Sequence, residues 1–517
     1  MKAWVPPISR RAVCVGLLGS AAAGSVRAAT PDAGATPDSF DFGAVVERAR
    51  RLAAAPYRAP APSAHPPLSY DAYRDVRFRP ARAFLNEKGS RFRMQLFPTG
   101  SKGSNQIAVN IVTAGVARPV RFSHDLFDFG PHVTKAGRAS VDGFAGLRLH
   151  YPLNTFTYFD EVIAFLGASY FRFVGRGQLY GQSTRGLAIG AGDPNQPEEF
   201  PVFREFWIVQ PSDDADQIEI MALLDSPSVA GAYRMIVRPG RDTSVEVHMR
   251  LFARAALDRL GLAPMTSMYF TGESGPRILD DFRREVHDSS GLLLRSNSGE
   301  WTWRPLCNPA ALALSAFAGP ISGFGLLQRM RSFDDYEDLE ANYQQRPSYW
   351  VEPIAGFEQG SVQLVELSET SETSDNIVAS WKPQAPVPAG RSHGWSYRMS
   401  TRNADPDRNI VARARHTLIA RSSHDLIGAA PGAQRFLIDY AGRELAPYLA
   451  HPEDLKIEAT ISAGRVSATS IARHPEAPLL RVTLDVIPNK GQRADMRLWL
   501  TSRGRQISET WAFPAQG

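Results

Sequence analysis

Hydrophobic and polar residues alternate with a period of two in many short runs between about residue 70 and residue 380, and no long helical pattern separates these runs. Such alternation places one face of each strand on a core and leaves the other face toward solvent or a groove. A parallel sheet would need long helices between its strands, so a parallel α/β fold is disfavoured. The sequence therefore predicts an all-β chain whose larger part is an antiparallel β-sandwich. The clearest of these runs are 106–112, 205–209, 217–224 and 243–251.

The chain has 517 residues, which is too long for one ordinary core, so two domains are expected. A proline-rich run over 382–391 indicates a linker. The short strands that follow it suggest an immunoglobulin-like sandwich, although the Cys-Trp-Cys spacing of antibody domains is absent. We thus predict a β-sandwich domain over 38–381, the linker, and a second domain over 392–517. The strands expected after the linker are 395–401, 410–420, 434–440, 455–461, 465–472, 479–487, 494–500 and 506–512.

Helical spacing is confined to two stretches. Apolar residues from Phe42 to Leu52 share one helical face, and Pro56 should end that helix. A second, short helix is expected from Phe333 to Tyr343.

The N-terminus carries Arg10 and Arg11 before a short, weakly apolar run, a pattern typical of a twin-arginine signal peptide. Small residues over 26–28 supply a cleavage site, so residues 1–29 are predicted to be the signal. The run is too short and too rich in Gly and Ala to span a membrane, and a disordered basic tail is the alternative. We expect export of the folded protein to the periplasm of a Gram-negative cell.

Composition excludes several classes of site. The net charge is only +5 and no dense Lys/Arg run occurs, so nucleic acid is not an expected partner. Cys307 would be the sole cysteine after signal removal, which rules out an internal disulfide and a cysteine-built zinc site, and a buried thiol is expected there. No His-x-x-x-His spacing occurs, and Gly175-x-Gly177 lacks the context of a phosphate loop, so neither a metal nor a cofactor is predicted.

Two polar stretches stand apart from the strand pattern. The stretch 280–305 combines carboxylates, arginines, a histidine and two tryptophans, and the stretch 369–381 combines acidic and hydroxyl residues with a tryptophan. Aromatic faces can stack on sugar rings while charged groups bind the hydroxyls, so both stretches suggest a sugar-binding cleft; in the alternative, the aromatics fill the core. The predicted substrate-binding residues are Trp301, Trp303, Arg304, Tyr343, Tyr349, Trp350, Glu372 and Trp381.

Asp288 and Asp375 are the candidate catalytic carboxylates. Glycoside cleavage needs one carboxylic acid and one carboxylate, set roughly 6.5–9.5 Å apart in inverting enzymes so that a water fits between them. Judged on local sequence alone, however, an aspartate before Ser or Asn is more typical of a turn.

A family resemblance runs through eight longer segments, 70–80, 144–154, 165–172, 199–207, 223–233, 299–306, 324–329 and 346–353. They resemble the periplasmic osmoregulated glucan biosynthesis proteins, the OpgG/OpgD (MdoG/MdoD) group, and the twin-arginine pattern is closer to the OpgD branch. The resemblance implies a galactose-mutarotase-like sandwich followed by an immunoglobulin-like domain, and action on β-1,2-glucan by an inverting mechanism. It also implies that Asp375 is the general acid and Asp288 the base, with the reverse assignment open; the family's Asp-Ser-Asp-Gly is Asp-Ser-Ser-Gly here, at 288–291.

The predicted activity therefore has two forms, hydrolysis of β-1,2-glucan and transglycosylation that gives a cyclic glucan. The same acid and base serve both, because the two outcomes differ in the acceptor that is bound. The competing hypothesis is a non-catalytic scaffold that binds nascent glucan and guides it at a membrane glucan synthase.

Overall fold

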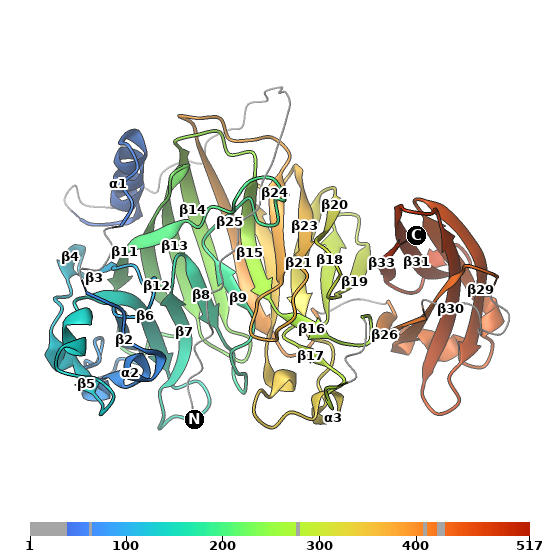
Figure 1. The fold of residues 1–517 in the computed structure, drawn as a ribbon, viewed down its shortest axis with the longest axis horizontal. Coiled ribbons are helices and arrows are strands. Elements are labelled where there is room, and N and C mark those ends of the chain that lie inside the picture. The colour runs from blue at the N-terminus through green and yellow to red at the C-terminus, as the bar shows by residue number, and fades with distance from the viewer. Residues whose placement is uncertain (1–38, 61–64, 276–279, 407–410, 421–429, 517) are drawn as a thin grey trace.

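The chain folds into two β-sandwiches joined side by side (Figure 1). The structure is a computed structural model, and it describes residues 39–60, 65–275, 280–406, 411–420 and 430–516. It is nearly all β, as the alternation predicts. The predicted twin-arginine signal lies outside the described residues, so its export role stays a prediction.

One face of the larger sandwich is a sheet of ten strands within the described residues. Every pairing in it is antiparallel. In sheet order its strands are β2 (Arg93–Pro98), β6 (Phe144–Tyr151), β7 (Asp160–Leu166), β8 (Tyr170–Phe173), β9 (Ser183–Arg185), β15 (Leu260–Ser267), β24 (Ile377–Pro383), β23 (Gly360–Glu366) and β20 (Ala313–Ala318), with β10 (Ala188–Ile189) beside β15.

The opposite sheet has fifteen strands in the described part of the chain, and it runs on into the smaller sandwich. The continuation is a parallel pairing between β19 and β33, so the two sandwiches share one sheet. In sheet order the strands are β28 (Lys456–Ile461), β31 (Arg493–Ser502), β33 (Thr510–Gln516), β19 (Trp301–Pro305), β18 (Gly291–Ser296), β21 (Ile321–Leu327), β22 (Ser348–Ala355), β25 (Ser392–Arg402), β14 (Ser244–Ala253), β13 (Val229–Arg238), β12 (Ile218–Asp225), β11 (Val202–Val209), β3 (Ala108–Thr113) and β4 (Val116–Pro119), with β32 (Arg505–Gln506) beside β31.

Among the described residues, the smaller sandwich is closed by a four-stranded antiparallel sheet. The two-sheet arrangement agrees with the strands predicted from residue 410 onward, while the immunoglobulin-like label stays a prediction. The strands of this sheet, in order, are β26 (Arg413–Ala420), β27 (Gln434–Ala441), β30 (Leu479–Pro488) and β29 (Gly464–Arg473).

Period-two burial builds the core of the larger sandwich. In β14, Val245, Val247, Met249 and Leu251 are buried, while the residues between them are more exposed. Full burial of such a side chain contributes about 1.5–3 kcal/mol, so a one-residue shift in register would be strongly destabilising.

The predicted domain boundary needs a correction. Strand β25 pairs with β14 and β22 of the larger sandwich, and its alternate residues Trp395, Tyr397 and Met399 lie in that core. The proline-rich run 382–391 therefore connects the two sheets of one sandwich instead of two domains. It is held there by backbone hydrogen bonds to the β14–β15 connection, including Leu257 N to Val387 O at 2.9 Å.

Helix α1 (Phe42–Ala54) forms where the apolar spacing predicts it. The Asp41 side chain accepts a hydrogen bond from Ala44 N at 3.1 Å and caps the N-terminus. Its buried residues Val45 and Ala49 pack with Trp207 on the outer face of the fifteen-stranded sheet.

The second predicted helix is shorter than expected. Helix α3 spans only Phe333–Tyr336, because Glu337 takes a left-handed conformation with φ 54°. The Asp338 side chain then accepts hydrogen bonds from Glu340 N and Ala341 N, which fold the next residues into a turn instead of a helix.

The remaining short elements lie in loops, and four of them form two-stranded pairs, β1 with β5 and β16 with β17. They are β1 (Val76–Phe78), β5 (Phe127–Phe129), β16 (Tyr269–Thr271), β17 (Val286–His287), α2 (Tyr70–Arg74) and the 3₁₀ turns Pro80–Arg82, His124–Leu126, Gly137–Ser140, Tyr343–Gln345, Arg443–Tyr448 and Pro452–Asp454.

Candidate functional site

Tyr269 in β16 brings the two candidate aspartates together. It pairs with His287, the residue before Asp288, in the register of β16 and β17. It also bonds Asn376, the residue after Asp375: Tyr269 N donates to Asn376 Oδ1 at 2.8 Å, and Asn376 Nδ2 donates to Tyr269 O at 2.9 Å. Residues 87 positions apart in sequence are thus held on either side of one short strand.

Asp288 is buried and paired with an arginine. Its N–H donates to Met268 O at 2.8 Å, which fixes its backbone. Its carboxylate forms an ion pair with Arg346. The Arg346 guanidinium lies 4.1 Å from the centre of the Tyr343 ring and also donates to Ala341 O at 3.2 Å, so the partner of Asp288 is itself held in place.

Asp375 has a different environment. It remains exposed to solvent, while protein surrounds it on several sides. The pKa of Asp375 is raised above its ordinary value mainly because the surrounding protein desolvates the carboxylate; Arg172 opposes this shift, and the negative charge of Asp288 adds to it. The two carboxyl groups therefore interact, and one of them is accessible and more easily protonated than a free aspartate.

Arg283 ties three loops together beside this pair. Its guanidinium lies 2.7 Å from Asp281, 2.9 Å from Asp338 and 2.8 Å from Glu372. The Tyr343 hydroxyl donates to the same Glu372 at 3.3 Å. The predicted residues Glu372 and Tyr343 thus lie at the site, and we use "the acidic site" for Asp288, Asp375 and Glu372 with Arg283 and Arg346.

A second group reaches Asp375 from β8 and β9. Arg185 is buried, forms an ion pair with Glu198, and lies 4.8 Å from the centre of the Tyr170 ring. Burial is the main cause that raises the pKa of Tyr170, and the charge of Asp375 contributes. Arg185 and Tyr170 therefore belong to the electrostatic surroundings of Asp375.

Seven of the eight predicted substrate-binding residues lie in the protein interior, so contact with substrate is not proposed for them. Tyr349 stacks on Phe173 with ring centres 4.6 Å apart, and Trp381 packs on Phe357. Large aromatics supply much apolar area, and here that area fills the cores. The seven residues, all less than 7% exposed, are Trp301, Trp303, Arg304, Tyr343, Tyr349, Trp350 and Trp381.

Arg304 is part of a buried ion pair, with its Nη2 2.6 Å from Glu366 Oε2. We expect Arg304→Met to lower the free energy of unfolding by about 3–5 kcal/mol, because Glu366 would be left buried without a counter-charge. Denaturant unfolding measures the change. The double variant Arg304→Met/Glu366→Gln should be more stable than Arg304→Met, and equal stability of the two variants would contradict this explanation.

Sequence reasoning missed two arginines, Arg346 of the acidic site and Arg185 in the surroundings of Asp375. Arg346 directly precedes a proline, and Arg185 lies in a short polar strand, so neither local pattern indicates a functional arginine. Their partners are distant in sequence, as in the Arg346–Asp288 pair, so no local signal identifies them.

Other predictions concern metals and the cysteine. Among the described residues, no group of three or more His, Cys, Asp or Glu side chains is placed to hold a metal ion. Cys307 is buried as predicted, and burial raises the pKa of its thiol to about 12.

In the described part of the chain, no helix has the length and apolar character needed to cross a membrane.

The fold and the site define a two-sandwich β protein with an accessible carboxyl and a buried, arginine-paired carboxylate at one site. The model of the MdoG family, described as periplasmic glucan biosynthesis protein, matches residues 40–515. The chain therefore belongs to the MdoG family of periplasmic glucan biosynthesis proteins.

Curated relatives agree with this assignment. Glucans biosynthesis protein G of Shewanella frigidimarina (strain NCIMB 400) is 41% identical over 92% of this chain and 84% of its own length. The protein of the same name from Shewanella sp. (strain MR-4) is 42% identical over 92% of this chain and 86% of its own. Both relatives carry the letter G in their names, whereas the assignment of this chain to the OpgD branch stays a prediction.

Among solved structures, a polysaccharide lyase aligns with 65% of this chain and 39% of its own at 9% identity. The TM-score is 0.20, and a likeness this weak supports no conclusion.

Proposed function

We propose that this protein cleaves β-1,2-glucan with inversion at the anomeric carbon, with Asp375 as the general acid and Asp288 as the base. The observation that carries the proposal is the contrast between the two interacting carboxyls. Asp375 is accessible and has a raised pKa, whereas Asp288 is buried against Arg346. Carboxyl pairs whose environments differ in this way are typical of acid and base roles.

In the proposed reaction Asp375 protonates the glycosidic oxygen as the bond to the anomeric carbon breaks. A water attacks that carbon from the opposite face and gives up a proton. Because Asp288 is only 4% exposed, that proton reaches it through a further water or a sugar hydroxyl. If a sugar hydroxyl takes the place of the attacking water, the same groups form a new glycosidic bond and can close a ring.

The pH dependence of turnover tests the acid assignment. Asp375 must be protonated to act, so kcat should fall as the pH rises through its raised pKa. Because the charge of Arg172 lowers that pKa, Arg172→Gln should move this fall to higher pH. Arg250→Gln, on the exposed face of β14, is the control and should leave the profile unchanged. A shift to lower pH in Arg172→Gln would contradict the assignment.

The non-catalytic scaffold remains the alternative, because the relatives are named for glucan biosynthesis and not for glucan cleavage. In that role the acidic site would hold nascent β-1,2-glucan beside a membrane synthase in the periplasm. Export by the twin-arginine route belongs to both hypotheses and rests on the Arg10-Arg11 pattern.

Product masses separate these functions. The mature protein is incubated with linear β-1,2-glucan, and binding is measured in parallel. Products that are shorter than the substrate and heavier by one water than the sum of their anhydro-sugar units indicate hydrolysis. Products that lack this water indicate ring closure, provided that ultraviolet absorbance shows no unsaturated sugar. Binding with unchanged substrate would reject the enzyme and favour the scaffold.

A further inference from the structure

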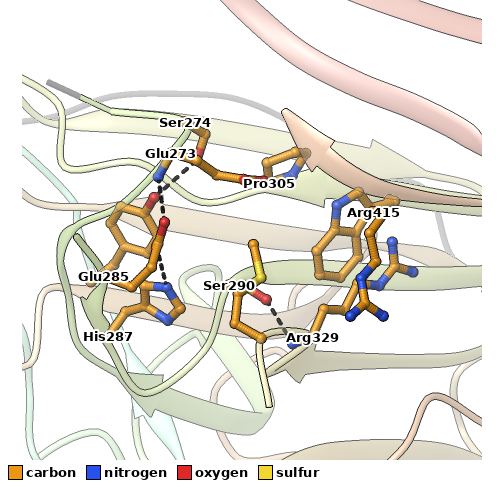
Figure 2. Close-up of a pocket in the computed structure, with 11 residues that line it drawn as sticks. Glu273, Ser274, Glu285, His287, Ser290, Pro305, Arg329 and Arg415 are labelled. Carbon is orange, nitrogen blue, oxygen red and sulfur yellow. Dashed lines mark hydrogen bonds and ion pairs between the residues drawn. The ribbon is translucent and has the colours of Figure 1, made fainter. Parts of the chain in front are cut away.

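Glu273 joins the two sandwiches at a pocket that Glu285 and His287 also line (Figure 2). In the smaller sandwich, His416 Nδ1 lies 2.8 Å from Glu273 Oε2, and Thr417 N donates to Glu273 Oε1 at 2.7 Å. Both contacts come from β26, so one carboxylate of the larger sandwich is held by two groups of the smaller one. The hydrogen bond to Glu273 raises the pKa of His416, which agrees with a ring nitrogen that donates.

A chain of hydrogen bonds leads from Glu273 toward Asp288. Glu273 N donates to Glu285 Oε1 at 3.0 Å, and Glu285 Oε2 lies 2.7 Å from His287 Nε2, as the dashed lines of Figure 2 show. His287 is fully buried and stacks on Tyr269 at a ring distance of 5.0 Å and an angle of 4°. It is also the residue that directly precedes Asp288, so its position fixes the backbone from which Asp288 projects.

The partner of Asp288 rests on the same histidine. The His287 and Tyr336 rings meet edge to face at 5.4 Å, and Tyr336 stacks on Tyr343 at 5.7 Å. Tyr343 in turn supports the Arg346 guanidinium that pairs with Asp288. Both the backbone and the ion-pair partner of Asp288 therefore depend on His287.

We propose that the smaller sandwich positions the catalytic base: His416 acts through Glu273, Glu285 and His287 to hold Asp288, and His416 is a positioning residue. The proposal rests on the proposed role of Asp288. A reacting group displaced by about 1 Å can lose on the order of 10²-fold in rate, so a contact outside the acidic site can control turnover. We call the four residues His416, Glu273, Glu285 and His287 the bridging chain.

The test compares two substitutions of His416. In His416→Ala the contact to Glu273 is lost, and kcat on β-1,2-glucan should fall by about 10-fold with KM unchanged. In His416→Asn the side-chain amide places an N–H donor close to the position of Nδ1, and kcat should return to within about 2-fold of the wild type. Recovery in His416→Asn would tie the loss of kcat in His416→Ala to this contact.

Arg493→Ala is the matched control, because Arg493 also joins the sandwiches. Its guanidinium contacts Leu314 O and lies 2.6 Å from Ser315 Oγ in β20, the last strand in the order of the ten-stranded sheet and apart from the bridging chain. This variant should keep the wild-type kcat. Equal loss of kcat in Arg493→Ala and His416→Ala would overturn the proposal in favour of general docking of the two sandwiches.

Hydrogen exchange at the Asp288 amide gives a readout that needs no turnover. This amide donates to Met268 O, and its exchange should be faster in His416→Ala than in the wild type, His416→Asn or Arg493→Ala. An active wild type whose kcat and exchange are both unaffected by His416→Ala would overturn the proposal. If the wild type shows no turnover, the proposed enzymatic function is rejected. Faster exchange in His416→Ala would then still show that His416 is coupled to Asp288, but without a role in catalysis.

Discussion

Asp375→Asn should lower the turnover of β-1,2-glucan by about 10²–10⁴-fold, the usual contribution of a positioned general acid. The amide has nearly the same size as the carboxyl but cannot donate a proton to the leaving oxygen. Because Asp375 is exposed and its neighbours Arg172 and Arg185 remain, glucan binding should be almost unchanged. Initial rates on linear glucan, with binding measured by calorimetry on the same sample, check both statements.

The control for this prediction is Asp128→Asn, which removes an exposed carboxylate that pairs with Arg79 away from the acidic site. It should have wild-type activity. A fully active Asp375→Asn variant would remove Asp375 from the mechanism. Loss of binding together with turnover would instead support a binding role for Asp375, as the scaffold alternative requires.

The fold was largely predictable because its core is built from local alternation. The runs predicted at 217–224 and 243–251 became β12 and β14 with bounds shifted by one or two residues. The placement of β25 was not predictable from pattern, because a strand alternates in the same way whichever sheet it joins. Proline-rich composition marks an extended segment, and here that segment crosses between sheets.

The acidic site was predictable only in part. Asp288 and Asp375 were candidates from their polar stretches, but each follows or precedes a strand in a way that also suits a turn, so only the family resemblance gave them catalytic roles. Their proximity depends on the bonds between Tyr269 and Asn376, which join residues 107 positions apart. The buried tryptophans show the converse limit, because composition cannot separate an aromatic that binds sugar from one that fills a core.

Asp288→Asn should also abolish most of the turnover, by a factor similar to that of Asp375→Asn, because an amide cannot accept the proton of the attacking water. The side-chain oxygen can still accept a hydrogen bond from Arg346, so the fold should be kept. Arg346 would, however, lose its counter-charge in a buried position, and a lower melting temperature is expected. Thermal unfolding therefore accompanies the rate measurement, and rates are taken well below the melting temperature of the variant.

An activated substrate separates the two roles. An aryl glycoside of a short β-1,2-glucan with a strongly acidic phenol leaves without protonation, so it needs the base but not the acid. Asp375→Asn should hydrolyse this substrate at close to the wild-type rate, while Asp288→Asn should remain inactive on it. The opposite pattern would exchange the two roles, because only the variant that lacks the acid gains from a better leaving group. Inactivity of both variants, with binding intact, would contradict the assignment of a general acid to either aspartate.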